Sequence, residues 1–229
     1  MVPPKVSSVI MGSTGMVGKG VLLECLKSDL VEKVLAINRH PLGINHPKLK
    51  EVVQENFNDF SAISSELKNY NACFYCIGIS AAGLSEEKYS KVNYDMVLTF
   101  AKDLYRVNPH LIFVYVSGKG TDSSEKGSVM WARVKGKTEN ALLKMGFKAA
   151  YMFRPGLIQP LGGLKSRTKW YNVFYAIFKP FYFVFKHFKN YVTNTEAMGK
   201  AMIAATVFGY RNNIIYSKEI NELSEHADL

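Results

Sequence analysis

The sequence predicts an α/β fold in which a doubly wound parallel sheet of about seven strands carries helices on both faces. Short runs rich in Val, Ile, Phe and Tyr alternate with longer stretches of helical period, as repeated βαβ units require. A glycine-rich turn at residues 12–18 directly follows the first run. The run at residues 111–116 is apolar throughout, which is typical of a strand that is buried on both faces.

The first part of the chain alternates strands with helices. Expected strands are short apolar runs, and expected helices have apolar positions at helical spacing. The expected strands are residues 6–11, 33–37, 49–53 and 71–78, and the expected helices are residues 16–26, 60–67 and 86–105. This order builds consecutive βαβ units and therefore a parallel sheet.

The second part continues the alternation and then changes in character. Its expected strands are residues 111–118, 148–156 and 212–217, and its expected helices are residues 131–145, 195–209 and 218–227. Residues 165–190 combine six Lys or Arg and no acid with many aromatic side chains. We therefore expect a core domain at residues 1–164 and a small C-terminal substrate-side lobe at residues 165–229 that packs on it.

Composition indicates one well-buried globular domain. The chain has 229 residues, 48% of them apolar and 21% charged, which is ordinary for a protein of this size. The net charge of +10 is compatible with nucleic acid, a membrane surface or acidic ligands and selects none of them. The start of the chain has no apolar leader, and no run reaches the roughly 18 apolar residues of a membrane helix. We expect a cytoplasmic protein.

The cysteines and histidines form no recognisable redox or metal motif. Three cysteines are too few for a disulfide scaffold. Cys73 and Cys76 have redox spacing, but they lie in an expected strand, whereas the reactive motif opens a helix. The five histidines lack ligand spacing such as H-E-x-x-H. We expect core cysteines, a reducing environment and no metal site.

The glycine loop, GSTGMVGKG at residues 12–20, does not fit a triphosphate site. The Walker A pattern G-x-x-x-x-G-K-[ST] would require a glycine at Ser13 and a hydroxyl side chain at Gly20. Both positions fail. Lys19, which suggests that pattern, is expected to be a solvated residue of the first helical turn.

The same loop does fit a dinucleotide site, and a glycine turn without a ligand is the alternative. The loop follows a strand and opens a helix, whose free N–H groups and positive dipole end receive a diphosphate. Gly12 would permit the tight turn, Gly15 the close approach of phosphate and Gly18 the packing of helix on strand. The other candidate ligands in the loop are Ser13, Thr14, Met16 and Val17.

The end of the second expected strand favours NADP(H) over NAD(H). Residues 38–40 are Asn38, Arg39 and His40, where an NAD site usually has an acid that binds the ribose 2′-hydroxyl. Arg39 can bind a 2′-phosphate through a forked, charge-assisted hydrogen bond; the alternative is a solvated loop arginine. Gly78, after the fourth strand, suits a close approach of the protein backbone to the middle ribose of the cofactor.

The form G-x-x-G-x-x-G resembles the loop of the short-chain dehydrogenase/reductase superfamily. The blocks VSGKGTDSS (116–124), WARVKGKTENAL (131–142), FRPGLIQP (153–160) and EKYSKVNYDMVLTFAKDL (87–104) resemble its atypical Tat-interacting-protein-like group. That resemblance implies an NADPH-binding Rossmann domain with some regulatory members. It also implies that Asp59 lies near the adenine and that the backbone from Pro155 to Leu157 approaches the nicotinamide.

The resemblance further implies catalytic roles, with one departure. The superfamily uses a Ser after the fifth strand and a Y-x-x-x-K pair, in which Lys holds the ribose and Tyr transfers a proton. Ser117 and Lys135 match, but Trp131 occupies the Tyr position. Indole does not titrate near neutral pH, so another group donates the proton, the substrate needs none, or turnover is lost. Tyr115, on the same strand face as Ser117, is a candidate substitute.

The basic aromatic segment at residues 165–190 leaves three interpretations open. It can be a substrate-pocket lid or a subunit contact in a homodimer, a peripheral contact with an anionic membrane, or plain core packing. Nucleic acid is not expected, because nucleic-acid binders usually spread basic residues along a groove.

Two functions follow from these observations. The first is a reductase, or an epimerase- or dehydratase-like enzyme, that acts with NADP(H) on a small carbonyl-containing substrate. The second is an NADP(H)-binding regulatory or scaffold protein that has lost turnover together with the tyrosine.

Overall fold

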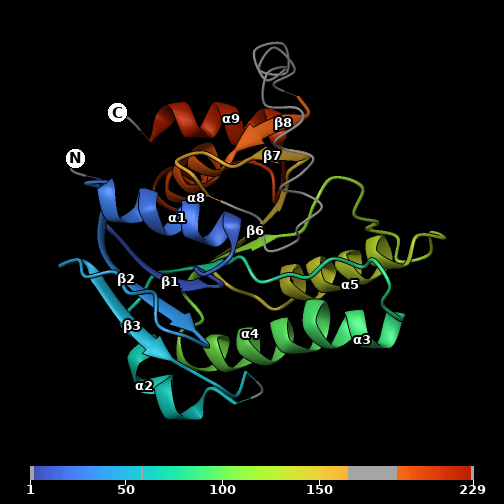
Figure 1. Ribbon diagram of the computed structural model, residues 1–229, viewed down its shortest axis with the longest axis horizontal. Helices are drawn as coiled ribbons and strands as arrows, with labels where there is room; N and C mark the ends of the chain where they lie inside the picture. The colour runs from blue at the N-terminus through green and yellow to red at the C-terminus, as the bar shows by residue number, and fades with distance from the viewer. Residues whose placement is uncertain (1–2, 58, 165–189, 228–229) are drawn as a thin grey trace.

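The computed structural model describes residues 3–57, 59–164 and 190–227. Within them lies a seven-stranded sheet with the strand order β3-β2-β1-β4-β5-β6-β9, in which every neighbouring pair is parallel. Figure 1 shows α1, α8 and α9 on one side of this sheet and α2, α3, α4 and α5 on the other. This is the doubly wound α/β fold that the sequence predicts.

The observed elements follow the predicted order closely. The sheet contains β1 (Val6–Met11), β2 (Val31–Asn38), β3 (Leu49–Val53), β4 (Ala72–Tyr75), β5 (Ile112–Val116), β6 (Ala149–Arg154) and β9 (Ile214–Tyr216). The helices are α1 (Met16–Lys27), α2 (Ser64–Leu67), α3 (Glu86–Ser90), α4 (Met96–Val107), α5 (Met130–Lys144), α8 (Thr195–Phe208) and α9 (Ser217–His226). A 3₁₀ turn, Ser61–Ile63, precedes α2, and a π-helical segment, Lys91–Asp95, joins α3 to α4.

The strands bury side chains on both faces because helices cover both. In β1, Val6 and Ile10 belong to the apolar core beneath α1 and α8, whereas Val9 and Met11 belong to the core that α4 and α5 cover. This alternation follows from the two-residue repeat of a strand. Cys73 is also fully buried in the second core, and its thiol is free.

The described C-terminal elements contribute to the main sheet and to the core. β9 pairs with β6 in the main sheet. α8 packs tightly on α1: a Cβ atom at Gly20 of α1 would lie only 2.6 Å from Cβ of Thr195 in α8. The boundary expected at residue 164 and the substrate-side lobe after it stay predictions. Residues 165–189, which carry most of the basic aromatic segment, lie outside the described residues.

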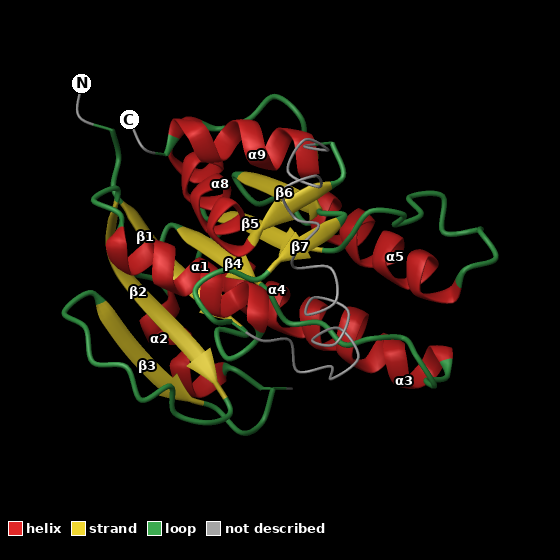
Figure 2. Cartoon of the chain, turned by 45° about the horizontal axis from the view of Figure 1, so that its top comes forward, coloured by secondary structure: helices red, strands yellow, loops and turns green. Residues whose placement is uncertain are grey.

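The structure contains a second, small sheet that the sequence analysis did not predict. β7 (Leu157–Gln159) pairs in parallel with β8 (Val192–Asn194). Each strand has three residues, too few for a two-residue repeat to be recognised in the sequence. Figure 2 shows β7 beside β6, at the end of the main sheet that carries the candidate site.

The part of the chain that the structure describes was searched for membrane-spanning helices and for groups of metal-binding side chains. No helix there combines the length and apolar character needed to cross a bilayer. No group of three or more His, Cys, Asp or Glu residues there is arranged to hold a metal ion.

Candidate functional site

The glycine loop lies where the chain order of the sheet reverses. β1 is flanked by β2 and β4, so the loops after β1 and β4 leave the sheet in different directions and open a crevice at its carboxyl edge. Gly12 to Gly18 follow β1, and Gly78 follows β4. Ligands of doubly wound sheets bind at this position.

Close contacts explain two of the glycines. Gly12 has a φ of +87°, and a Cβ atom there would lie 2.8 Å from Cγ1 of Ile77. At Gly18 a Cβ atom would lie 2.2 Å from the carbonyl oxygen of Gly12. Any larger residue at these positions would force α1 and the β4 loop away from β1.

The N-terminus of α1 faces this crevice without a side-chain cap. Its N-cap is Gly15, which has no side chain that could accept a hydrogen bond from the first turn. The half-buried residues Met16 and Val17 begin the helix. Uncapped N–H groups and the helix dipole together favour an anion, whereas Lys19 is exposed, as expected for a first-turn residue.

Ser13 and Asn38 have internal partners. The buried Ser13 hydroxyl donates to Oδ1 of Asn38 at 2.7 Å, and Nδ2 of Asn38 donates to Glu51 at 3.1 Å. The Glu51 carboxylate also accepts the backbone N–H of Leu42. These bonds tie the glycine loop to the end of β2 and leave Arg39, the next residue, exposed.

Asp59 is exposed and caps a turn. Its carboxylate accepts the backbone N–H of Ser61 at 2.9 Å, and this hydrogen bond lowers the pKa of Asp59. The structure therefore gives Asp59 a local partner at the start of the 3₁₀ turn.

Lys135 of α5 reaches the crevice beside Gly78. Its Nζ donates to the carbonyl oxygens of Ser117, at 2.7 Å, and Val116, at 3.4 Å. A Cβ atom at Gly78 would lie 3.9 Å from this Nζ. Desolvation by burial lowers the pKa of Lys135 to about 8, although Glu139 acts in the opposite direction.

Asn93 is a site residue that the sequence analysis missed. It is fully buried in the π-helical segment, and its Nδ2 donates to the carbonyl oxygen of Tyr89 at 3.2 Å. Its Oδ1 is buried, accepts no hydrogen bond from a described residue, and would lie 3.4 Å from a Cβ atom at Gly78. A buried unsatisfied acceptor is costly unless a ligand or water pairs with it.

A sequence signal for Asn93 did exist. Tyr89, Asn93 and Val97 recur every four residues, so Asn93 falls on the apolar stripe of its helix. An amide at such a position needs a reason, and π-helical segments are frequent at functional sites.

The three remaining catalytic candidates, Ser117, Tyr115 and Trp131, are engaged in contacts within the protein. The Ser117 hydroxyl donates to the carbonyl oxygen of Phe153 at 3.1 Å. Tyr115 is fully buried, its hydroxyl donates to the carbonyl oxygen of Asn93 at 3.4 Å, and burial raises its pKa well above the usual value. The ring of Trp131 lies against Gly120, where Cη2 would be 3.2 Å from a Cβ atom.

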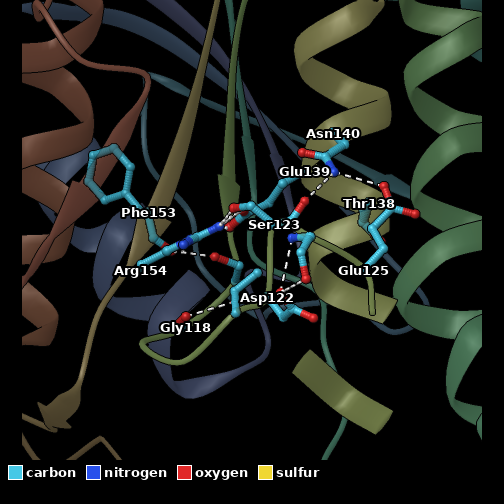
Figure 3. Close-up of polar contacts among 12 residues, drawn as sticks. Gly118, Asp122, Ser123, Glu125, Thr138, Glu139, Asn140, Phe153 and Arg154 are labelled. Atoms are coloured by element: carbon cyan, nitrogen blue, oxygen red, sulfur yellow. Dashed lines mark hydrogen bonds and ion pairs between the residues drawn. The ribbon is translucent and has the colours of Figure 1, made fainter. Parts of the chain in front are cut away.

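A buried ion pair fastens α5 to β6 near these residues. Nε of Arg154 donates to both carboxylate oxygens of Glu139 at 3.1 Å, and Nη2 donates to the same group. Nη2 also donates to the Ser123 hydroxyl at 2.6 Å, and Nη1 to that of Tyr216 at 3.3 Å. Figure 3 shows Arg154 between Glu139 and Ser123, so the pair joins β6, β9, α5 and the loop after β5.

The backbone after β6 lies at the same edge of the sheet. The carbonyl oxygen of Pro155 accepts the N–H of Lys119 at 2.8 Å, and the N–H of Leu157 donates to Tyr191 at 2.9 Å. Pro155 thus adjoins the loop after β5, whereas Leu157 adjoins the residue before β8.

The chain is similar in sequence to named proteins of fungi and of a mammal. The protein FMP52-1 of Scheffersomyces stipitis is 27% identical over 154 residues, which cover 66% of this chain and 67% of that protein. HTATIP2 of Rattus norvegicus is 28% identical over 154 residues, which cover 66% of this chain and 62% of that protein. No protein-family model matches the chain.

Solved structures support the fold. A short-chain dehydrogenase family protein of Francisella tularensis aligns with a TM-score of 0.65 at 13% identity over 94% of this chain and 98% of that one. The carbonyl reductase Sniffer of D. melanogaster aligns with a TM-score of 0.62 at 14% identity over 93% of this chain and 97% of that one.

The names of the fungal relatives contradict the expected cytoplasmic location. The FMP52 proteins of S. stipitis, Aspergillus terreus and Emericella nidulans are all named mitochondrial. The expectation was wrong because it rested on the lack of an apolar leader, whereas mitochondrial targeting segments are amphipathic and basic. The chain is thus a homologue, at 27–28% identity, of the proteins HTATIP2 and FMP52-1, and it has the Rossmann-like α/β fold of solved short-chain dehydrogenase and epimerase structures.

Proposed function

We propose that the protein binds a nicotinamide dinucleotide, NADPH in preference to NADH, and reduces a small carbonyl compound with it. The observation that carries this proposal is the uncapped N-terminus of α1 behind Gly12, Gly15 and Gly18, at the switch point of the sheet. Helix N-termini in this position bind the diphosphate of dinucleotides.

The described residues fit the rest of such a cofactor. Above Gly78, the unpaired Oδ1 of Asn93 can accept a hydrogen bond from a sugar hydroxyl. Nζ of Lys135 can donate one to a sugar hydroxyl. Gly78 itself is exposed, which leaves room for that approach. When bound, the reduced nicotinamide supplies a hydride to the substrate.

Arg39 supports the preference for NADPH. Asn38 is held by Ser13 and Glu51, so Arg39 is the exposed group at the end of β2. A guanidinium there pairs with a 2′-phosphate in a forked geometry. The Glu51 carboxylate is already hydrogen-bonded by Asn38 and Leu42, which partly compensates its charge.

A second function, cofactor binding without turnover, is favoured by the catalytic positions. Trp131 offers no titratable proton, and the Ser117 hydroxyl is bonded to the carbonyl oxygen of Phe153. A regulatory or scaffold protein would need the dinucleotide site but no proton donor. The two functions therefore differ in turnover and agree on binding.

Cofactor binding is tested by calorimetric titration of the full chain with NADPH and NADH. We expect NADPH to bind more tightly, and Arg39→Gln to weaken NADPH about tenfold while leaving NADH within about twofold, since one charged hydrogen bond is worth roughly 1.5–3 kcal/mol. The control is Arg211→Gln, an exposed position before β9, at the opposite edge of the sheet. Failure of both dinucleotides to bind would refute the proposal.

A further inference from the structure

The loop after β5 carries a lysine that forms no ion pair. Lys119 is exposed, and among the described residues no carboxylate pairs with it. Its Nζ lies instead over the ring of Tyr191, 3.5 Å from the ring centroid. The face of an aromatic ring attracts an ammonium group without neutralising its charge. Lys119 therefore keeps both its charge and its N–H donors for another partner.

The turn after β6 holds the backbone of both residues. The carbonyl oxygen of Pro155 accepts the N–H of Lys119 at 2.8 Å, and the carbonyl oxygen of Tyr191 accepts the N–H of Leu157 at 2.9 Å. Between these two positions, a Cβ atom at Gly156 would collide with the carbonyl oxygen of Tyr191. The contact between Lys119 and Tyr191 thus joins two segments that are fastened to the same turn.

Lys119 lies beside positions to which the resemblance gives catalytic roles. Before it in the chain, the carbonyl oxygen of Ser117 accepts a hydrogen bond from Nζ of Lys135 at 2.7 Å. After it, a Cβ atom at Gly120 would lie 3.2 Å from Cη2 of Trp131. Two residues of extended chain span at most about 7 Å. A ring compound that lies against Ser117 and Trp131 can therefore reach Lys119 with a substituent.

The acids of the same loop are engaged by other groups. The Asp122 carboxylate accepts the backbone N–H of Ser124 at 2.9 Å and the Ser124 hydroxyl at 2.6 Å, and these hydrogen bonds lower the pKa of Asp122. Oε1 of Glu125 accepts Nδ2 of Asn140 at 2.7 Å (Figure 3). Both carboxylates are thus held along the loop, and the charge of Lys119 is left for a ligand.

Exposed apolar side chains occur at the same edge of the sheet. Ile79 follows Gly78 and is 40% exposed, Val129 precedes α5 and is 50% exposed, and Tyr191 precedes β8 and is 55% exposed. Small-molecule sites combine mostly apolar walls with a few polar or charged groups that set specificity. An apolar rim with one unpaired ammonium group fits an apolar molecule that carries one negative charge.

We propose that Lys119, held on the ring of Tyr191, binds a carboxylate of the carbonyl substrate, so that the protein prefers aromatic or apolar aldehydes and ketones that carry a carboxylate. The inference rests on the proposed function, of which it names the substrate class. The ammonium group donates a charge-assisted hydrogen bond to the carboxylate. One ammonium group balances the single charge of a carboxylate, whereas a phosphate group carries about −1.5 to −2.

Binding is tested first, by calorimetric titration of the full chain saturated with NADP⁺. The probes are 4-formylbenzoate and its uncharged methyl ester. At low ionic strength we expect the acid to bind about fivefold more tightly than the ester, as one hydrogen bond to a charged group allows. Lys119→Gln should reduce this ratio to about one without weakening the ester, whereas Lys126→Gln, at an exposed lysine of the same loop, should preserve it.

Variants of Tyr191 test whether the ring positions the lysine. Tyr191→Phe keeps an aromatic face and should keep the preference for the acid, whereas Tyr191→Leu leaves the Lys119 side chain unrestrained and should lower it. Added salt should lower the preference of the wild type as well, because it screens an exposed charge. A ratio that is the same in Tyr191→Leu and Tyr191→Phe would contradict a positioning role of the ring.

Turnover is tested second, by the consumption of NADPH with the same two aldehydes. The carboxylate lies away from the reacting carbonyl group, so its contact with Lys119 is the same in the ground state and the transition state. Lys119→Gln should therefore raise KM for the acid about fivefold and leave kcat within about twofold. The KM of the ester should not change.

The outcomes separate the two proposals. If NADPH does not bind the wild type, the proposed function fails, and the ratio of acid to ester binding in the protein without cofactor still decides whether Lys119 holds a carboxylate. If NADPH binds and the wild type does not favour the acid, or if Lys119→Gln favours it equally, the role of Lys119 is overturned while the dinucleotide site stands.

Discussion

Lys135 is the residue at which stability and proposed function conflict. Burying an ammonium group without an ion pair disfavours its charged form. The fall of its pKa from 10.5 to about 8 corresponds to about 3 kcal/mol of destabilisation at neutral pH. An apolar residue would fit this position better, so its presence points to a role beyond packing.

Lys135→Met should therefore stabilise the protein at pH 7 by about 2 kcal/mol, after allowance for the lost hydrogen bond to Ser117. The unfolded wild type binds more protons than the folded form between pH 8 and 10.5, so wild-type stability rises through this window. The advantage of the variant should shrink accordingly and be largely gone at pH 10.5. Urea unfolding at pH 7, 8.5 and 10 measures it, and Lys137→Met is the exposed control. A variant that is less stable at pH 7 contradicts the argument.

At the scale of elements, the loop before α5 packs against the helix and hydrogen-bonds to it. The carbonyl oxygen of Asp122 would lie 1.8 Å from a Cβ atom at Gly136, so the loop rests on the backbone of the helix. Asn140 donates to Ser123 and Glu125, and Arg133 to Gly127. These contacts hold the loop along α5 from its first turn to Asn140.

Gly136→Ala tests this packing, because two effects oppose one another. Helix propensity favours alanine by about 1 kcal/mol, whereas displacing the loop costs roughly 1–3 kcal/mol or more. With a contact as short as 1.8 Å we expect the second effect to win and the variant to be destabilised by about 1–2 kcal/mol. Chemical denaturation measures the change, and Lys137→Ala, next in the helix, should stay within about 0.5 kcal/mol. A more stable Gly136→Ala would show that the loop is not held there.

On the scale of the whole molecule, the candidate site joins both halves of the sheet. The glycine loop and Arg39 belong to the β1–β2 side, whereas Asn93 and Lys135 follow β4 and β5 in the chain. A ligand that contacts both sets links elements that are distant in sequence. It should therefore stabilise the molecule as a unit.

NADPH should raise the melting temperature of the full chain more than NADH does. At a free concentration of 100 times Kd, a ligand of the folded state adds about 2.7 kcal/mol to the free energy of unfolding. For a protein of this size each kcal/mol raises Tm by about 2–4 °C. Arg39→Gln should reduce the NADPH shift to that of NADH. Equal shifts for both dinucleotides in the wild type would remove the preference for NADPH.

The elements of the main sheet could be predicted because each carries a local signal. The β-branched and aromatic runs, the helical periods and the glycine turn at residues 12–18 all act through neighbours in sequence. Helix 86–105 was predicted as one element, and its π-helical segment, Lys91–Asp95, was not, because helical periodicity does not reveal one extra residue per turn. The short strands β7 and β8 were missed for lack of length.

Some features of the candidate site could likewise be predicted from the sequence, and others could not. The doubly wound order of elements, the glycine loop and the presence of Trp131 at the expected tyrosine position can all be read from the sequence, since they depend on residue types at fixed spacing. Three features depend on the tertiary structure: the hydrogen bond between Ser13 and Asn38, the unpaired oxygen of Asn93 among the described residues, and the ion pair of Arg154 with Glu139. The two pairings join residues that are 25 and 15 positions apart in sequence, so contact between folded elements sets them, and no local pattern encodes them.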